Sequence, residues 1–459
     1  MERLALAYLK HWKTRNLRKP LVIRGARQVG KSTLVQLFGS ASFENLVVLN
    51  FERDPELAQL FASKSPQKIV TLLELHLNVP IQPGKTLLFL DEIQSAPAVM
   101  SSLRYFHEEL PELHLIAAGS LLEIALEQSS TPMPVGRIEY LHLGPMQFEE
   151  FLLAAGHGRL VAFLSTFSVN DTIPRPVHNQ LLALLREFMV TGGMPEAVKA
   201  FVDTGSHREC DTIKQSILST FQDDFTKYGP RTNHPKLIKV YKALPRLSCS
   251  RFKYAHVDQH ERAKDLSGAL HLLCLARVAH RVVHTSCNGL PLGAEVNDRK
   301  FKVLFLDLGL MMRALGLTLL DLQQTNNPSW VNQGALCEQL VGQHLLYSQE
   351  FYQEPELHFW VREKRNAAAE VDFVIAEGAT PFPVEVKAGK TGTLKSLHLF
   401  LQEKALSFGV RFNSASPSLL QTTSRTPQGK DHPFTLLSLP LYLVGQLRRL
   451  AREVDGNLG

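Results

Sequence analysis

The sequence predicts an α/β protein that begins with a parallel sheet covered by helices on both faces. Short apolar segments of strand type recur at residues 20–25, 45–51, 86–92, 113–119 and 138–143. Segments with helical spacing lie between them, for example at residues 56–62, 69–77 and 99–110, and an amphipathic helix is expected at 1–18. Strands that alternate with helices are typical of a parallel sheet, and such a sheet binds its ligand at the carboxyl ends of the strands.

The composition is that of an ordinary globular protein. The chain has 459 residues, enough for about three domains, and 44% of them are hydrophobic and 20% charged. We find no apolar run long enough for a membrane span and no signal peptide, and the five scattered cysteines favour a reducing cytoplasm. The net charge of +6 suggests a nucleic-acid partner without requiring one.

The first chemical motif follows the first strand. Its pattern is G-x-x-x-x-G-K-[ST], a phosphate loop placed between a strand and a helix. The glycines let the backbone amides face a phosphate, Lys31 would neutralise the β- and γ-phosphate oxygens, and the Ser32 hydroxyl would hold Mg²⁺. We therefore expect ATP to bind at Gly25, Ala26, Arg27, Gln28, Val29, Gly30, Lys31, Ser32 and Thr33.

Two carboxylates end the strand at 86–92. Asp91 is expected to bind Mg²⁺ opposite Ser32, and Glu92 to act as the general base on the attacking water. Ser120, after a further strand, would detect the γ-phosphate, although an ordinary serine at a strand end is equally consistent with the pattern. Arg137 is a candidate arginine finger for a neighbouring subunit, with a solvated surface arginine as the alternative.

The middle of the chain changes character. Residues 148–235 read as helices that would form a lid, and residues 236–322 read as helices followed by a β-ribbon, which is typical of a winged helix. Several lysines and arginines in the first part of this second segment make DNA contact and a purely protein-pairing role equally consistent with the sequence.

A second constellation lies near the carboxyl end. Asp372 and Glu385 fall on two strands joined by a turn, and Lys387 shares a face with Glu385 because strand side chains alternate. Glu338, on a preceding helix, would reach the same point. Three carboxylates and a lysine suggest a Mg²⁺-dependent phosphodiesterase in which Glu338, Asp372 and Glu385 hold the metal and Lys387 assists catalysis. A charged hairpin with an ion pair and a nuclease that has lost its activity are the alternatives.

Taken together, the motifs resemble a family of bacterial and archaeal ATPases that join an AAA-type domain to a C-terminal domain of uncharacterised function. The segments that carry the resemblance include 24–31, 90–94, 119–120, 136–137, 145–151, 192–196, 224–225, 305–310, 370–373 and 384–387. Met146 and Gln147 depart from the expected pattern, and the middle segment is unusually rich in histidine and arginine. The resemblance implies an AAA+ P-loop core and a C-terminal fold similar to restriction endonucleases.

The expected division is an AAA+ core at 1–147, a helical lid at 148–235, a winged-helix-like domain at 236–322 and a restriction-endonuclease-like domain at 323–459. The expected function is that of a cytoplasmic ATPase, assembled as a homo-oligomeric ring, which acts on DNA and carries a Mg²⁺-dependent nuclease site. The alternative is an ATP-dependent switch or scaffold whose nuclease-like domain only binds DNA or protein. A protein remodeller without nucleic acid is a third hypothesis.

Overall fold

A computed structural model describes residues 1–128, 134, 136–228, 233–319, 333–363, 368–378, 380–389, 393–425 and 431–456. The chain forms two compact units. Unit 1 contains residues 1–146 together with two later segments, 271–278 and 349–355, and unit 2 contains the rest. Among the described helices, none is both long and apolar enough to cross a membrane.

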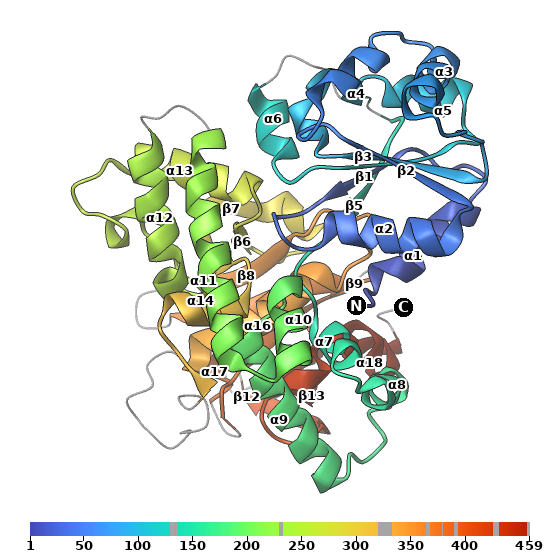
Figure 1. Ribbon diagram of the computed structural model, residues 1–459. Coiled ribbons are helices and arrows are strands. Elements are labelled where there is room, and N and C mark those ends of the chain that lie inside the picture. The colour runs from blue at the N-terminus through green and yellow to red at the C-terminus, as the bar shows by residue number, and fades with distance from the viewer. Residues whose placement is uncertain are drawn as a thin grey trace. The chain divides into compact units, whose positions relative to one another are not determined.

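Unit 1 is built on a five-stranded, fully parallel sheet in the order β2-β3-β4-β1-β5 (Figure 1). The strands are β1 (Leu21–Arg24), β2 (Asn45–Asn50), β3 (Thr86–Asp91), β4 (His114–Ala118) and β5 (Glu139–His142). All five correspond to the predicted strands, so the predicted parallel α/β core is confirmed.

Helices cover both faces of this sheet. The helices α1 (Ala5–Thr14) and α2 (Lys31–Ser42) lie on one face in Figure 1, and α3 (Pro66–Leu77), α4 (Pro97–Met100) and α5 (Leu103–Glu109) lie on the other. The segment predicted as a helix at 56–62 is the 3₁₀ helix η1 (Pro55–Phe61). After β3 and β4 come η2 (Ile93–Ser95) and α6 (Leu122–Gln128).

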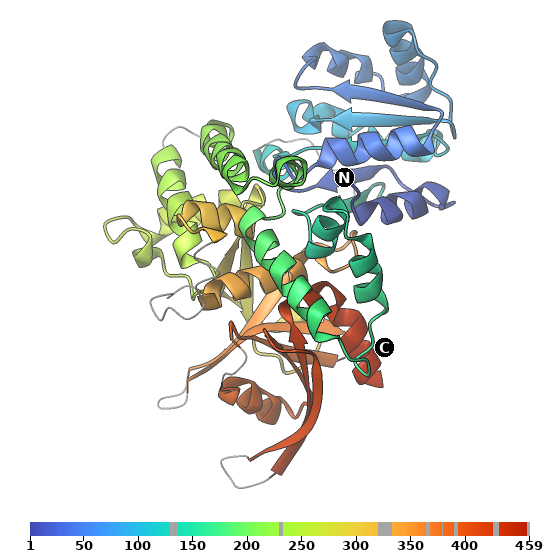
Figure 2. The ribbon, with the colours of Figure 1, turned by 60° about the horizontal axis from the view of Figure 1, so that its bottom comes forward.

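Unit 2 contains an eight-stranded mixed sheet in the order β12-β13-β11-β10-β9-β8-β6-β7 (Figure 2). The strands are β6 (Ala279–Thr285), β7 (Val296–Phe305), β8 (Leu357–Arg362), β9 (Ala369–Glu377), β10 (Thr380–Val386), β11 (Phe408–Asn413), β12 (Ser418–Arg425) and β13 (Asp431–Pro440). β10, β11 and β13 run parallel to one another, as do β6 and β8, and the other neighbours are antiparallel.

The first helices of unit 2 lie in the stretch predicted to be helical, and the later ones lie between the strands along the chain. They are α7 (Phe148–Ala154), α8 (Gly158–Thr166), α9 (Arg175–Thr191), α10 (Pro195–Thr204), α11 (His207–Asp223), α12 (His234–Leu247), α14 (Leu308–Ala314), α16 (Gln333–Tyr347), α17 (Lys395–Lys404) and α18 (Leu447–Val454), with α13 (Ala263–Leu275) ending in unit 1. Short 3₁₀ turns are η3 (Asp224–Lys227), η5 (Tyr254–His256), η6 (Leu292–Glu295) and η7 (Leu441–Gln446).

The β-ribbon predicted for a winged helix is present as β6 and β7, but these strands are part of the same sheet as β8 to β13. The pairing of β6 with β8 therefore joins the middle segment and the C-terminal segment in one layer. The expected boundary between residues 322 and 323 lies outside the described residues, and the division into four domains stays a prediction.

A close backbone contact in unit 2 explains the Gly192-Gly193 motif. Gly192 has a φ of +80°, and a Cβ on it would lie 2.4 Å from the Asp307 carboxylate. Asp307 is fully buried and accepts hydrogen bonds from the backbone amides of Gly193 at 2.7 Å and of Leu310 at 2.9 Å, so it links the turn before α10 to the first turn of α14. Gly309 has no side chain because the backbone of Gly192 occupies that space.

This contact predicts that Gly309→Ala destabilises the protein, since the new Cβ would lie 2.5 Å from the Cα of Gly192. We expect a loss of about 1–3 kcal/mol, seen as a lower midpoint of thermal unfolding. The matched control is Gly268→Ala on α13, where a Cβ meets no atom within 4 Å. Equal changes in the thermal midpoint for Gly309→Ala and Gly268→Ala would contradict the steric contact between Gly309 and Gly192.

Candidate functional site

The phosphate loop of unit 1 lies between β1 and α2, as predicted. Gly30 precedes the helix with a φ of +91°, and Gly25 has a φ of +156° and no space for a Cβ, which would lie 2.2 Å from the Leu143 carbonyl oxygen. Only glycine fits both positions without strain. The loop therefore has the shape that lets its amides converge at the amino end of α2.

Lys31 and Ser32 lie where the motif predicts them. The Lys31 ammonium is buried and donates to two carbonyls of its own loop, at 2.9 Å to Gly25 and 2.7 Å to Ala26. The Ser32 hydroxyl donates to the Asp91 carboxylate at 2.9 Å. Serine hydroxyl and carboxylate oxygens side by side are hard ligands of the kind that Mg²⁺ takes, so the residues fit a Mg²⁺–nucleotide complex.

Glu92 follows Asp91 at the carboxyl end of β3. It has a φ of +51°, a left-handed conformation that is uncommon for a glutamate and is often found at functional sites. Its carboxylate accepts a hydrogen bond from the Gln94 amide and is half-buried. Glu92 therefore lies beside the Asp91–Ser32 pair, where a general base for an attacking water is needed.

The structure places Ser120 close to the loop and Arg137 far along the sheet. Ser120 is buried, and its hydroxyl accepts a hydrogen bond at 3.2 Å from Arg27 of the phosphate loop. Arg137 precedes β5, which is parallel to β1. It therefore lies at the amino ends of these strands, whereas the phosphate loop follows the carboxyl end of β1. It forms an ion pair with Glu108 at 2.8 Å. Arg137 is therefore not placed to serve the nucleotide of its own unit.

A charged cluster beside the loop was not predicted. Glu123 on α6 lies 3.6 Å from Arg24, the last residue of β1, and 3.6 Å from Arg277. Arg277 also pairs with Glu354, which lies 3.4 Å from His142. Arg277 and Glu354 come from the two late segments of unit 1. Their sequences carry no motif, and only the fold shows that they meet near the first strand.

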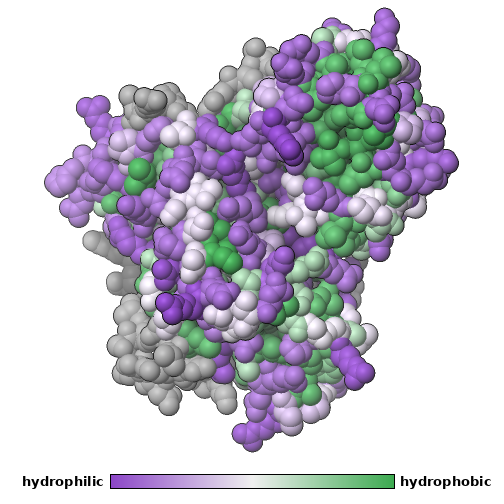
Figure 3. All heavy atoms as spheres, viewed as in Figure 1, coloured by the Kyte–Doolittle hydropathy of each residue, from purple (hydrophilic) through white to green (hydrophobic). Residues whose placement is uncertain are grey.

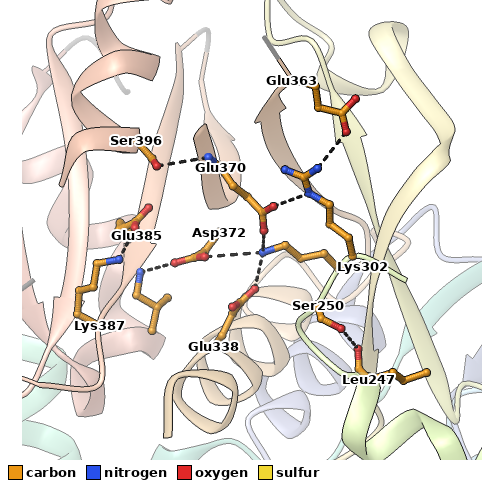
Figure 4. Close-up of polar contacts among 12 residues, drawn as sticks. Leu247, Ser250, Lys302, Glu338, Glu363, Glu370, Asp372, Glu385, Lys387 and Ser396 are labelled. Carbon is orange, nitrogen blue, oxygen red and sulfur yellow. Dashed lines mark hydrogen bonds and ion pairs between the residues drawn. The ribbon is translucent and has the colours of Figure 1, made fainter. Parts of the chain in front are cut away.

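In unit 2 the predicted carboxylates meet around a lysine that sequence reasoning missed. The ammonium of Lys302, on β7, lies 2.7 Å from Glu338 of α16, 2.7 Å from Glu370 and 3.7 Å from Asp372, both on β9 (Figure 4). The Lys302 side chain is 1% exposed. Its signal in the sequence is a single charge within the apolar strand from Phe301 to Phe305.

The remaining members of the cluster are also paired. Lys387 forms an ion pair with Glu385, and the Asp372 carboxylate accepts a hydrogen bond from the Val386 amide at 2.8 Å. Arg251 pairs with Glu370 at 2.7 Å. Glu385 and Lys387 share a face, as predicted, and Glu338, Asp372 and Glu385 do come from the expected helix and strands.

The charges around Lys302 set the protonation of the cluster. Burial alone would lower the pKa of Lys302, but Glu338, Asp372 and Glu370 raise it, so the ammonium is retained. Burial raises the pKa of Glu338 to about 8 and that of Glu385 to about 7, and the nearby Asp372 adds to both shifts.

This arrangement does not fit a bound divalent cation. An ammonium of the chain already lies among three of the carboxylates, and Glu385 is engaged by Lys387. Within the described ranges, no group of three or more His, Cys, Asp or Glu side chains is arranged to hold a metal ion. The carboxylates expected to bind the metal are therefore present, but they are paired with lysine side chains of the same chain.

The basic residues of the predicted winged helix are mostly paired as well. Lys236 lies 2.8 Å from Asp265, Lys239 lies 2.7 Å from Asp258, and Arg246 donates to the His256 carbonyl oxygen at 2.6 Å. Much of the positive charge that suggested DNA contact here is thus neutralised within the segment.

All five cysteines are free thiols.

Comparison with protein families supports the assignment of the N-terminal part. A family model described as an AAA domain matches residues 17–152. Two further models, each described as a domain of unknown function (DUF8612 and DUF4143), match residues 182–321 and 333–442. No match was found among the curated proteins.

Three solved structures illustrate what the chain is similar to. The Aeropyrum pernix ORC2 protein in ADPNP–ADP complexes has 13% identity and a TM-score of 0.35, over 71% of this chain and 95% of that chain. The Aeropyrum pernix ORC1 protein in complex with DNA has 12% identity and a TM-score of 0.29, over 69% and 93%. The Thermotoga maritima RuvB Holliday junction branch migration motor has 15% identity and a TM-score of 0.28, over 64% and 90%.

These TM-scores are too low to support an argument about this chain. The assignment depends instead on the parallel sheet, the phosphate loop with Ser32 beside Asp91, and the family match over the same residues. Residues 17–152 therefore contain an AAA domain with the features of a nucleotide-binding core.

Proposed function

We propose that the protein is an ATPase that uses ATP hydrolysis to act on DNA as a switch or motor. The observation that carries the ATPase assignment is the convergence of Lys31, Ser32, Asp91 and Glu92 at the carboxyl ends of β1 and β3. In this proposal Lys31 leaves its loop carbonyls to neutralise the β- and γ-phosphates, and Glu92 takes a proton from the attacking water.

Mg²⁺, held by Ser32 and Asp91, would supply positive charge to the phosphates. The Thr33 backbone and the loop amides from Gly25 onward would orient the phosphates, and Ser120 would contact the γ-phosphate through its place beside Arg27. Apart from the movement of the Lys31 side chain, these roles use the side chains where the structure has them, with no rearrangement of the sheet.

We propose a homo-oligomer because Arg137 lies away from its own loop. If Arg137 is an arginine finger, its place at the amino end of β5 means that it serves the nucleotide of a neighbour. Apolar surface on unit 1 supports such contacts: Val48 on the edge strand β2 and Leu37 on α2 are 39% and 42% exposed. Figure 3 shows apolar residues gathered over the sheet of unit 1 on the face drawn.

For unit 2 we propose binding without cleavage. The support is Lys302, whose ammonium lies among the carboxylates that a nuclease would use for its metal. A Mg²⁺-dependent nuclease is the second candidate, and the observation that favours it is the presence of Asp372, Glu385 and Lys387 on neighbouring strands. DNA as partner is supported by the net charge of +6.

Hydrolysis should depend on Glu92 much more than binding does, because a general base acts on water. Glu92→Gln should retain ATP and lower turnover by about 10²-fold or more, measured as phosphate release. Lys31→Ala should lose binding itself, measured with a fluorescent ATP analogue. Near-normal turnover of Glu92→Gln would show that another residue positions the water.

ATP affinity should fall as the pH rises above about 8. Burial lowers the pKa of Lys31 to about 8, with Glu92, Glu123 and Asp91 opposing this shift, whereas bound phosphates would hold the ammonium charged. Binding then takes up a proton at high pH, so affinity should drop by up to about tenfold per pH unit.

The measurement is a series of titrations with the fluorescent ATP analogue from neutral to alkaline pH. Lys31→Arg is the control, since a guanidinium stays charged throughout this range. If that variant binds, its affinity should be flat across the series. A wild-type affinity that is also flat would contradict the role of Lys31.

The role of Lys302 can be separated from nuclease activity by thermal unfolding. Lys302→Met leaves Glu338, Glu370 and Asp372 without their common cation and should cost roughly 3 kcal/mol, at the low end for a broken buried pair because the carboxylates are partly exposed. Mn²⁺ should raise the midpoint of this variant and leave that of the wild type unchanged.

Lys300→Met is the matched control, since Lys300 lies on the same strand and pairs with the exposed Glu363. It should change stability little and gain no response to Mn²⁺. Stabilisation of the wild type by Mn²⁺, together with Mn²⁺-dependent DNA cleavage that Asp372→Ala abolishes, would establish the nuclease instead.

A further inference from the structure

A groove of about 780 Å³ lies at the carboxyl ends of three parallel strands in unit 2. Its floor includes the residues that follow β10 (Ala388 and Gly389), β11 (Ser414 to Ser416) and β13 (Leu441). The helix α9 and the first turns of α16 form its walls. The carboxyl ends of parallel strands are where α/β sheets bind ligands, and this volume is in the range of ligand sites.

The lining is positive, and the described residues that form it include no carboxylate. Residues Arg175, Asn179, Leu182, Arg186 and Met189 line it from one face of α9, at helical spacing. Both arginines are exposed, and neither has an ion pair within the described part of the chain. Of the leucines that line it, Leu182 on α9 is half-buried and offers non-polar surface, whereas Leu185, Leu336 and Leu441 are buried. The chemistry suits an anion that also carries apolar groups.

The spacing of the two arginines indicates a ligand with more than one anionic group. Their Cα atoms are eleven residues apart on α9, which is about 16 Å along a helix axis. Two anionic groups spaced along the helix could each pair with one of these arginines. A single strand of nucleic acid has repeated phosphates and bases with flat, apolar faces, and it fits a charged groove with a non-polar floor. A groove of this volume is too small for a duplex.

The groove also adjoins the carboxylate cluster. Cys337, which lines it, precedes Glu338, and Ala388 follows Lys387. The Lys387 side chain is 26% exposed and is paired with Glu385. A strand lying along α9 would therefore pass the cluster in which the metal position is taken by Lys302.

We infer that this groove binds single-stranded nucleic acid, with the phosphates on Arg175 and Arg186 and the bases against Leu182 of α9. The inference deepens the proposed function and rests on it, since that proposal names DNA without its form. It assigns the contact to unit 2 and to a single strand.

The test uses the full-length protein with Lys31→Ala, so that the phosphate loop does not contribute. Fluorescence anisotropy compares a labelled oligothymidylate with a labelled duplex of the same length. We expect the single strand to bind more tightly, and Arg175→Glu with Arg186→Glu to weaken it by about tenfold or more while reducing its salt dependence. Arg208→Glu on α11, an exposed arginine outside the groove, should leave binding nearly unchanged.

A second variant removes the apolar contact without changing the charge of the groove. Leu182→Asn should also weaken binding of the oligothymidylate, and its thermal midpoint checks that the protein is folded. Equal affinity of the arginine double variant and of Arg208→Glu for the oligothymidylate would overturn the inference. So would a mononucleotide that displaces the oligothymidylate with the same affinity as an unlabelled oligothymidylate. Absence of binding to any DNA would overturn the DNA part of the proposed function as well, while phosphate release tests the ATPase separately.

Discussion

A buried ammonium needs acceptors for its hydrogen bonds, and around Lys302 in unit 2 these acceptors are carboxylates from distant parts of the chain. Lys302 lies on the edge strand β7, whereas Glu370 and Asp372 lie on β9, three strands away. In a flat sheet these strands would be about 14 Å apart, farther than a lysine side chain reaches. The 2.7 Å contact therefore requires the sheet to curl at this end, and the ammonium lies 5.4 Å from the centre of the Phe359 ring on the intervening strand β8.

The same cluster explains why a nuclease-like pattern of residues need not mean a nuclease. Asp372 and Glu385 lie close together because β9 and β10 are paired, and Lys387 directly follows β10. Their chemistry, however, depends on what else is buried nearby. A lysine from a distant part of the chain satisfies the carboxylates electrostatically, and it does so without offering a position at which water could be activated.

The parts of the fold that were predictable are those encoded locally. The phosphate loop, the Asp91–Glu92 strand end and the strands of unit 1 each depend on a few adjacent residues, and all lie where they were expected. The position of Lys302, and the joining of β6 to β8, depend on pairings between segments far apart in sequence. The register between β8 and β9 also shifts between His358 and Trp360, so simple alternation fails near Asp372. A single sequence carries no local signal for these features.

The chain also crosses between its two units several times. Arg277 and Glu354, which pair with each other and lie near Arg24 and Glu123, immediately precede the parallel neighbours β6 and β8. A recombinant fragment that ends at Met146 would therefore leave Arg24 and Glu123 facing water where their partners belong. The spatial unit that carries the phosphate loop is thus not one contiguous stretch of the gene, because its last pieces are encoded more than a hundred residues downstream of Met146.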